Sequence, residues 1–409
     1  MASVALAAAT TACNPPITSS GDVAVRDSAH IRIVENFNPA WKTPESAWRV
    51  APDPLLVIGE AIGTPEYEFH SISDVTLLGS GRIAVALGSA AEVRVYDSDG
   101  SFRLRFGRRG GGPGEFAMAH RVDETADGML HVWDGTDGRL SVFGPDGSFV
   151  RSIWVPHGSA FIGGGYLGFL RDGSLLHLLV RRTYRTDEGL LRDTNRVVRY
   201  SPETEAVDTI IRIQGQEIYH QSVGTARNRN WVIFGRGSFV TLRGNDIVYG
   251  ETDQFELRVI TPEGDLTTIY RLHVPPIQVS SQDIHRERDR RRDNARAPHL
   301  DPVVRELRER GAERVPARAT LPAFGTIRVD SDNNLWIEQA RLPTSDRQIW
   351  HVVDSAGRWL GDVETPAGIQ VHYIGGDLLA GTGRDEWDAM FVALFPIIKP
   401  NAVAEREVF

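Results

Sequence analysis

The chain has 409 residues, a formal net charge of −9 and 24% charged residues. This acidic balance argues against nucleic-acid binding, because proteins that bind nucleic acids present a basic face to the phosphates. No apolar run is long enough to cross a bilayer as a helix. A chain of this length exceeds a typical compact domain unless its elements repeat, so an internal repeat is the first possibility that its length raises.

The single cysteine, Cys13, excludes an intrachain disulfide and predicts a lipid anchor. Residues 3–12 before it are small and mostly apolar, and residues 14–21 after it form a polar tether. This arrangement resembles the end of a bacterial lipoprotein signal, in which the cysteine becomes the lipidated first residue of the mature chain. The resemblance implies a signal remnant and tether over residues 1–28, and a protein on the periplasmic or extracellular side of the cell envelope. A disordered N-terminus with an incidental thiol is the alternative.

Two short strands are predicted before the repeat begins. Residues 30–35 alternate between β-branched and polar side chains, which is typical of a strand. A Pro-containing segment with Trp41 and Trp48 follows, and then residues 55–58 form an apolar run that ends at Gly59. We expect residues 29–409 to form one domain.

A glycine-rich connector lies at residues 105–116, with the sequence RFGRRGGGPGEF, and a degenerate copy lies at residues 57–69. Its glycines tolerate positive φ, and Pro113 then stiffens the chain where it enters the next unit. A phosphate-binding loop is the alternative, but that loop would need a following helix and usually Gly-Lys-Ser/Thr. The pattern therefore favours a structural connector.

The connectors alternate with units of four short predicted strands, of which residues 74–78, 82–87, 92–96 and 102–106 are the clearest set. The first turn of each unit is marked six times, at Gly81, Gly128, Gly173, Asn245, Asn333 and Gly376. The second turn is marked five times, at residues 97–100, 144–147, 201–204, 261–264 and 354–357. Four strands per unit and a period of roughly 40 to 50 residues predict an all-β fold, the β-propeller. Because the last unit lacks its second turn, we expect residues 55–58 to supply its outer strand and close a six-bladed ring.

Three segments are longer than the repeat requires: residues 181–195, 214–234 and 275–320. The last follows the fourth unit and contains a helix-capping Ser280 or Ser281 and a helix-ending Gly311, which predict a helical insert between blades 4 and 5. Its arginines are interspersed with acids, which favours a solvated, ion-paired helical hairpin over a nucleic-acid-binding arm. All three segments belong on the face with the connectors, so we expect the binding surface there.

The unit with Phe-Gly, Gly-Pro-Gly-Glu-Phe, a strand, Asp-Gly and a later Pro-Asp-Gly resembles the NHL-repeat propellers, especially bacterial six-bladed ones that are secreted or lipid-anchored. The resemblance covers residues 54–400. It implies the fold, and it implies function poorly, because binding scaffolds, lyases and lactone hydrolases share that fold.

We expect a non-catalytic binding or scaffold module of the cell envelope that recognises a protein, peptide or glycan. We expect it to be a monomer without cofactor, metal or nucleic-acid partner, in contact with the membrane only through its anchor. The alternative is a periplasmic lyase or hydrolase that acts at the mouth of the central channel. The candidate ligand-binding residues are Glu66, Tyr67, His70, Asp74, Glu115, Phe116, His120 and Asp123. At the channel mouth, Asp330 is a further candidate beside His70, Asp74, His120 and Asp123. Each of these channel candidates is equally explained as a turn or rim residue bonded to backbone groups.

Overall fold

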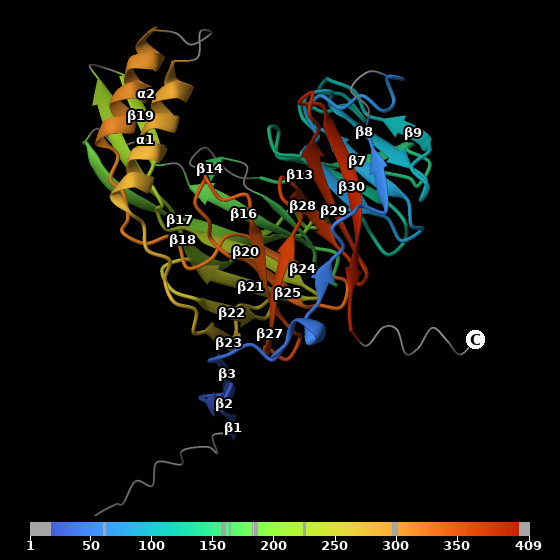
Figure 1. Ribbon diagram of the computed structural model, residues 1–409. Helices are drawn as coiled ribbons and strands as arrows, with labels where there is room; N and C mark the ends of the chain where they lie inside the picture. The colour runs from blue at the N-terminus through green and yellow to red at the C-terminus, as the bar shows by residue number, and fades with distance from the viewer. Residues whose placement is uncertain are drawn as a thin grey trace, which may run out of the picture.

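The fold is a β-propeller, as predicted. A computed structural model describes residues 18–59, 63–156, 161–162, 165–181, 183, 187–223, 226–296 and 302–400, and these residues form six sheets (Figure 1). Cys13 lies outside the described residues, so its predicted lipidation stays a prediction.

The first two sheets each have four antiparallel strands in sequence order. The first contains β6 (Asp74–Leu77), β7 (Ile83–Leu87), β8 (Glu92–Tyr96) and β9 (Phe102–Phe106). The second contains β10 (Arg121–Glu124), β11 (Leu130–Asp134), β12 (Arg139–Phe143) and β13 (Phe149–Trp154). Apolar side chains of the two sheets and of the connector pack together, with Phe106 and Phe143 at 4.6 Å between ring centroids and Phe116 fully buried.

The third and fourth sheets are larger. The third contains β14 (Phe161–Ile162), β15 (Tyr166–Phe169), β16 (Leu175–Arg181), β17 (Gly189–Tyr200), β18 (Val207–Val223) and β19 (Ala226–Trp231). The fourth contains β20 (Ser238–Arg243), β21 (Asp246–Glu251), β22 (Glu256–Ile260) and β23 (Leu266–Leu272). Three N-terminal strands extend its outer edge: β1 (Thr18–Ser20), β2 (Val23–Ser28) and β3 (Ile31–Asn36).

The fifth sheet contains β24 (Ile327–Val329), β25 (Leu335–Glu338), β26 (Gln348–Val353) and β27 (Trp359–Thr365). The sixth contains β28 (Gln370–Ile374), β29 (Leu378–Arg384) and β30 (Met390–Ile398), and its outer edge is completed by β4 (Arg49–Val50) and β5 (Leu56–Ile58). A short 3-10 helix at Pro44–Ser46 precedes β4. The predicted closing strand is confirmed, because Ile58 lies opposite Val392 and Leu56 opposite Leu394 in an antiparallel pair.

The first strands of the six sheets follow one another around a ring. β6 contacts both β10 and β28, β20 contacts both β15 and β24, and β24 contacts β28. Arg121 Nη1 links β10 to β15 by a 3.1 Å hydrogen bond to Tyr166 O. Each marked first turn lies between the first and second strands of its sheet, with Gly81, for example, at φ +78°. We call the space that these strands enclose the central channel.

The N-terminal segment runs along the outer edges of the last three sheets, and we call residues 31–58 the belt. β3 pairs in parallel with β23 of the fourth sheet. The amides of Ala40 and Trp41 then donate to Trp359 O (2.9 Å) and Leu360 O (2.7 Å) on the fifth sheet, and β4 and β5 pair with β30 of the sixth. The strand predicted at residues 30–35 is therefore confirmed, but its place on the fourth sheet was not predicted.

The predicted long loops differ from the structure in one respect. Residues 189–195 and much of 214–234 are strand, because β17 and β18 continue past their sheet as a paired ribbon and β19 adds to it. The Gln- and Asn-rich composition of this segment hid its two-residue alternation. Residues 275–320 contain α1 (Ser281–Ala295), capped by Ser280 Oγ at the Asp283 amide, and α2 (Pro302–Arg314). Gly311 lies inside α2 and does not end it.

Candidate functional site

The three long segments meet in one projection, which we call the arm. It comprises α1, α2, β19 and the extended ends of β17 and β18, and α1, α2 and β19 stand away from the other sheets in Figure 1. Leu307 O on α2 accepts hydrogen bonds from Gln221 Nε2 on β18 (3.0 Å) and Asn228 Nδ2 on β19 (3.5 Å). Because Gln221 is only 3% exposed, this contact is enclosed between the helices and the strands.

The segment before β17 joins the same projection. Arg314 at the end of α2 forms an ion pair with Glu188 (3.2 Å), and Arg229 of β19 forms another with the buried Asp193 of β17 (3.0 Å). Segments that are far apart in the sequence therefore hold one another in place. The projection is built as a two-layer module, with helices on one side and strands on the other.

A buried carboxylate locks the base of the arm to the propeller. Glu217 forms an ion pair with Arg318 and accepts a 2.8 Å hydrogen bond from the Arg236 amide. Burial raises the pKa of Glu217, but these two bonds outweigh it and hold that pKa below its ordinary value. Arg236 in turn donates to Thr320 Oγ1 (2.5 Å) and Thr320 O (3.1 Å). The base is therefore held by charge-assisted bonds, which are stronger than neutral ones.

The arm differs in charge from the rest of the chain. Residues 275–320 contain eleven Arg and eight Asp or Glu, a formal charge of +3, and residues 181–195 and 214–234 each carry +1. The three segments thus carry +5, and the remaining chain carries −14. Many of these arginines are paired, for example Arg290 and Arg291 with Glu287, so the surface is mixed rather than uniformly basic.

A pocket of about 290 Å³ lies where the arm meets the fourth and fifth sheets. Its apolar wall includes Phe234, Phe239 and Phe324, and its polar rim includes Glu338 and Arg341, which approach each other to 3.7 Å. Apolar walls with a few polar groups are typical of ligand pockets. The rest of its lining is Gln216, Gly235, Gly237, Thr252, Leu321, Pro322, Gly325, Gln339 and Ala340.

A second group of polar residues lies on the first strands around the central channel. Asp74, the first residue of β6, accepts a hydrogen bond from the Val122 amide at Oδ2 (3.2 Å). Its Oδ1 lies 3.4 Å from Nδ1 of His372 on β28, and His372 Nε2 lies 3.1 Å from Thr382 Oγ1. The order carboxylate, imidazole, hydroxyl resembles that of a hydrolase triad. Thr382 is only 4% exposed, however, so its hydroxyl is enclosed and serves packing rather than attack on a substrate.

Arg121 and Asp123 of β10 form a bidentate ion pair, with Nε 2.8 Å from Oδ2 and Nη2 3.2 Å from Oδ1. Their side chains are 42% and 28% exposed although they lie on an innermost strand, so they face the channel. Burial raises the pKa of Asp123, and Arg121 opposes that rise. Burial likewise raises the pKa of the Tyr166 phenol.

Arg328 of β24 is the fourth charged residue of this group, after Asp74, Arg121 and Asp123. Its Nη1 donates to His372 O at 2.6 Å, and its buried Nε has no acceptor among the described residues. Burial lowers the pKa of Arg328, and Asp74 partly offsets that effect. A cavity of about 530 Å³ lies at the other end of β6 and β10, among the first turns, where Asp123, Glu124 and Tyr373 contribute to its wall.

The structure brings together only two of the eight predicted residues, Asp74 and Asp123. The Glu66 carbonyl accepts from Tyr96 Oη (2.6 Å), and Tyr67 Oη accepts from the Phe102 amide (2.9 Å), so both support the outer half of the first sheet. His70 is exposed, and His120 Nδ1 accepts from the Gly135 amide (3.0 Å).

The remaining two predicted residues, Glu115 and Phe116, belong to the connector. Phe116 is fully buried in the core, and Glu115 pairs with Arg108 at 2.7 Å while accepting from the Gly112 amide at 2.8 Å. The further candidate Asp330 caps its own turn, where it accepts from the Asn334 amide at 2.8 Å. These contacts agree with the alternative that such residues are turn or rim residues bonded to backbone groups.

Sequence reasoning missed Arg121, Arg328 and His372. Arg121 had a usable signal, because it precedes Asp123 by two residues at the start of a predicted first strand. Arg328 and His372 had no such signal. Arg328 lies two residues before a turn, and His372 lies at an irregular position in the pairing of β28 with β29.

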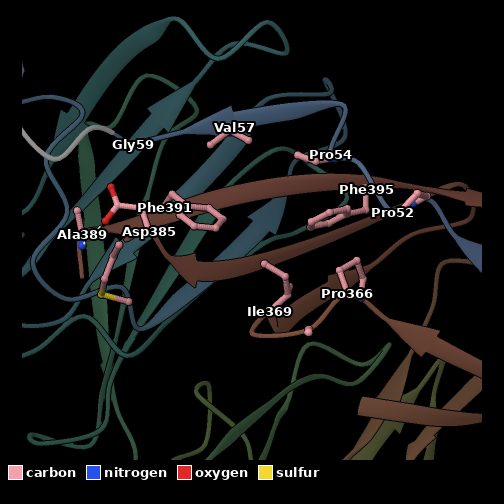
Figure 2. A pocket seen from close by; sticks show the side chains of 12 residues that line it. Pro52, Pro54, Val57, Gly59, Pro366, Ile369, Asp385, Ala389, Phe391 and Phe395 are labelled. Carbon is pink, nitrogen blue, oxygen red and sulfur yellow. Dashed lines mark hydrogen bonds between the residues drawn. The ribbon is translucent and has the colours of Figure 1, made fainter. Parts of the chain in front are cut away.

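An apolar cavity of about 430 Å³ lies at the seam where the belt joins the sixth sheet. Figure 2 shows Val57 of β5 opposite Phe391 and Phe395 of β30, with Ile369 and Pro366 on the far wall. β4 and β5 both pair with β30, and residues 51–55 bulge between them, which leaves this gap beside Phe395. We attribute the cavity to that bulge.

In the part of the chain that the structure describes, no three His, Asp or Glu side chains gather in a way that could hold a metal ion. Within the same residues, neither helix is long and apolar enough to span a membrane.

Comparison with known proteins yields no family model and no curated protein that matches the chain. Among solved structures, a DUF4221-family member from Bacteroides vulgatus shares 11% identity over 87% of this chain and 99% of its own, with a TM-score of 0.54. Virginiamycin B lyase from Staphylococcus aureus matches with a TM-score of 0.40 at 11% identity, over 80% of this chain and 95% of its own. Regucalcin from Agrobacterium tumefaciens, a calcium-binding protein, matches with a TM-score of 0.39 at 10% identity, over 86% and 95%. The first likeness concerns the fold alone, and the other two are too distant to carry an argument.

Proposed function

We propose that this protein is a binding module of the cell envelope, and that the arm and the pocket at its base recognise a protein, peptide or glycan. The observation that carries the proposal is the convergence of all three long segments in one projection. Ordering a residue costs roughly 1–2 kcal/mol of backbone entropy, so a long ordered segment without a role is unfavourable. Long segments on a rigid scaffold are also where binding residues concentrate.

The mixed lining of the base pocket supports a peptide-like or glycan-like ligand. Phe234 and Phe239 offer apolar surface, while Gln216, Gln339 and the Glu338–Arg341 pair offer donors and acceptors at the rim. A ligand seated there would touch both the arm and the propeller. We further propose that the six sheets are the six blades of an NHL-type ring, and that Cys13 carries the lipid anchor.

A periplasmic lyase or hydrolase is the second candidate, and one observation favours it. Asp74, His372 and Arg121 gather around the channel, and titratable groups gathered in this way are candidates for catalysis. Burial opposes the charge of Arg121, yet Asp123 and Asp74 raise its pKa, so it stays a cation.

Most of the arm can be removed, because each excision point is already closed by hydrogen bonds; only the extended end of β17 stays in place. Residues 277–279 pair with residues 319–321, so residues 280–318 can be replaced by Asn-Gly. Ser238 Oγ donates to Gln214 O at 2.6 Å, so residues 215–237 can be replaced by Gly-Gly. Both excisions must be made together, since either alone would uncover the buried Gln221 contact.

The test compares the wild-type protein with the doubly excised one on peptide and glycan arrays. We expect the excised protein to keep its cooperative unfolding transition and to lose every array signal of the wild type. Phe234→Ala with Arg341→Ala should weaken the same signals, whereas Arg347→Ala, which breaks a surface pair with Glu364, should not. Array signals that survive the double excision would place the site elsewhere.

A further inference from the structure

The two arginines of the central channel differ in their partners: Arg121 pairs with a carboxylate, and Arg328, within the described part of the chain, does not. Asp123 occupies one edge of the Arg121 guanidinium, and Tyr166 O occupies another of its N–H groups. Arg328 has only His372 O, a neutral acceptor, and among the described residues no carboxylate lies within ion-pair distance of it. Arg328 is half-buried and its Nε is enclosed, so part of this cation is withdrawn from water without such a counter-charge, which is unfavourable unless a partner binds.

Asp74 is the nearest candidate counter-ion, but both of its oxygens are engaged with other groups. Oδ2 accepts from the Val122 amide, and Oδ1 faces His372 Nδ1. It stabilises Arg121 and Arg328 through space only. Two guanidinium groups therefore lie near Asp74, whose carboxylate is already engaged with β10 and β28.

We propose that Arg328, assisted by Arg121, binds a compact oxyanion, a carboxylate or a phosphate, that enters the central channel. A guanidinium group presents its N–H donors in a planar fork that matches the two oxygens of such an anion. The Nε of Arg328 is enclosed, but its second Nη has no hydrogen-bond partner among the described residues, so this Nη is the donor that the protein leaves to a ligand. Arg121 is 42% exposed toward the same space, so an anion can reach it without rearrangement of the strand.

The site is independent of the proposed recognition by the arm. Asp74, Arg121 and Tyr166 begin their strands at the end of the ring from which the arm projects, so an anion would enter from that side. The oxyanion could be a free phosphate or the terminal carboxylate of a peptide. Both present the same chemistry to Arg328, and the experiment separates them.

The experiment measures binding to the full chain by isothermal titration at constant ionic strength, with inorganic phosphate, acetate, and trialanine with a free or an amidated C-terminus. We expect saturable binding of at least one oxyanion and none of the amidated peptide. Arg328→Gln should weaken that binding about tenfold or more, the usual value of a charge-assisted hydrogen bond. Arg347→Gln, on the outer surface, should leave it unchanged.

Arg328→Lys keeps the charge but removes the fork, so it should bind with intermediate affinity and guards against misfolding of the glutamine variant. Preference for phosphate over trialanine would indicate a free anion, and the reverse would indicate a peptide terminus. The doubly excised protein should bind the anion as the wild type does. Equal binding by the Arg328→Gln protein, or no saturable binding of any oxyanion by the wild type, would overturn the proposal.

Discussion

Replacement of Asn36 by Ala should destabilise the protein strongly, although the side chain is small and polar. Asn36 lies at the end of β3 and is fully buried. Its Nδ2 donates to Gly357 O (3.0 Å) and Arg271 O (3.3 Å), and its Oδ1 accepts from the Trp359 amide (2.8 Å). One amide side chain thus joins the belt to the fourth and fifth sheets.

The magnitude follows from what the substitution leaves behind. Asn36→Ala strands the buried Trp359 amide and Gly357 carbonyl, and each buried group without a partner costs about 1–3 kcal/mol. Allowing for partial relaxation, we expect a loss of about 2–4 kcal/mol. With an m-value of about 3 kcal/mol per molar, the urea midpoint would fall by roughly 1 M.

The assay is equilibrium urea unfolding followed by tryptophan fluorescence, because Trp41 and Trp48 belong to the belt and Trp359 lies beside it. Asn38→Ala, two residues later on the exposed surface, is the matched control and should change stability by less than about 0.5 kcal/mol. If Asn36→Ala unfolds at the same urea concentration as the control, the belt does not brace these sheets and the reasoning fails.

Three further predictions concern the core and the closure of the ring. Burial lowers the pKa of His131 to about 4, below its ordinary 6.5, so the unfolded state binds more protons between those two pH values. The free energy of unfolding should therefore fall by about 3 kcal/mol as the pH drops from 6.5 to 4. The free energy of unfolding of the His131→Phe protein, measured over the same pH range, should fall less. A Cβ on Gly361 would lie 2.2 Å from Trp41 Cε3, so Gly361→Ala should displace the belt, lower the melting temperature and shift Trp fluorescence, and an unchanged spectrum would contradict this. Deletion of residues 1–58 should abolish cooperative unfolding, whereas deletion of 1–28 should spare it, and identical transitions would show that the closing strands are dispensable.

The repeat could be predicted from the sequence because its signals are local. Turns that need positive φ require glycine or asparagine at set positions, and Gly81 and Asn333 lie in that conformation. The continuous apolar run of β7 and the alternation of polar and apolar residues over β8 are equally local signals. Six first turns against five second turns even predicted the closing strand, because an unpaired outer edge is a liability that a ring removes.

The extension of β17 and β18 could not be predicted in the same way. A strand that continues beyond its sheet needs a partner on each side, and those partners come from β19 and from helices about 80 residues later. Polar residues such as Gln221 and Asn228 suit a loop when considered alone. Gln221 is buried and Asn228 half-buried here only because α2 lies against them and Leu307 O accepts their hydrogen bonds.

The candidate sites show the same division. Acid-rich strand starts indicated Asp74 and Asp123, since a carboxylate at such a position has a recognisable local pattern. Arg328 and His372 come from the fifth and sixth sheets and meet Asp74 only when the ring closes. The sequence by itself therefore determined the turns and most of the strands, whose conformations depend on near neighbours, and the count of turns indicated the closing segment even though its partner, β30, lies far along the chain. The tertiary structure alone decided the arm, the belt and the channel residues, because their environment is made by segments far apart in the sequence: about 80 residues in the arm and about 300 in the belt and the channel.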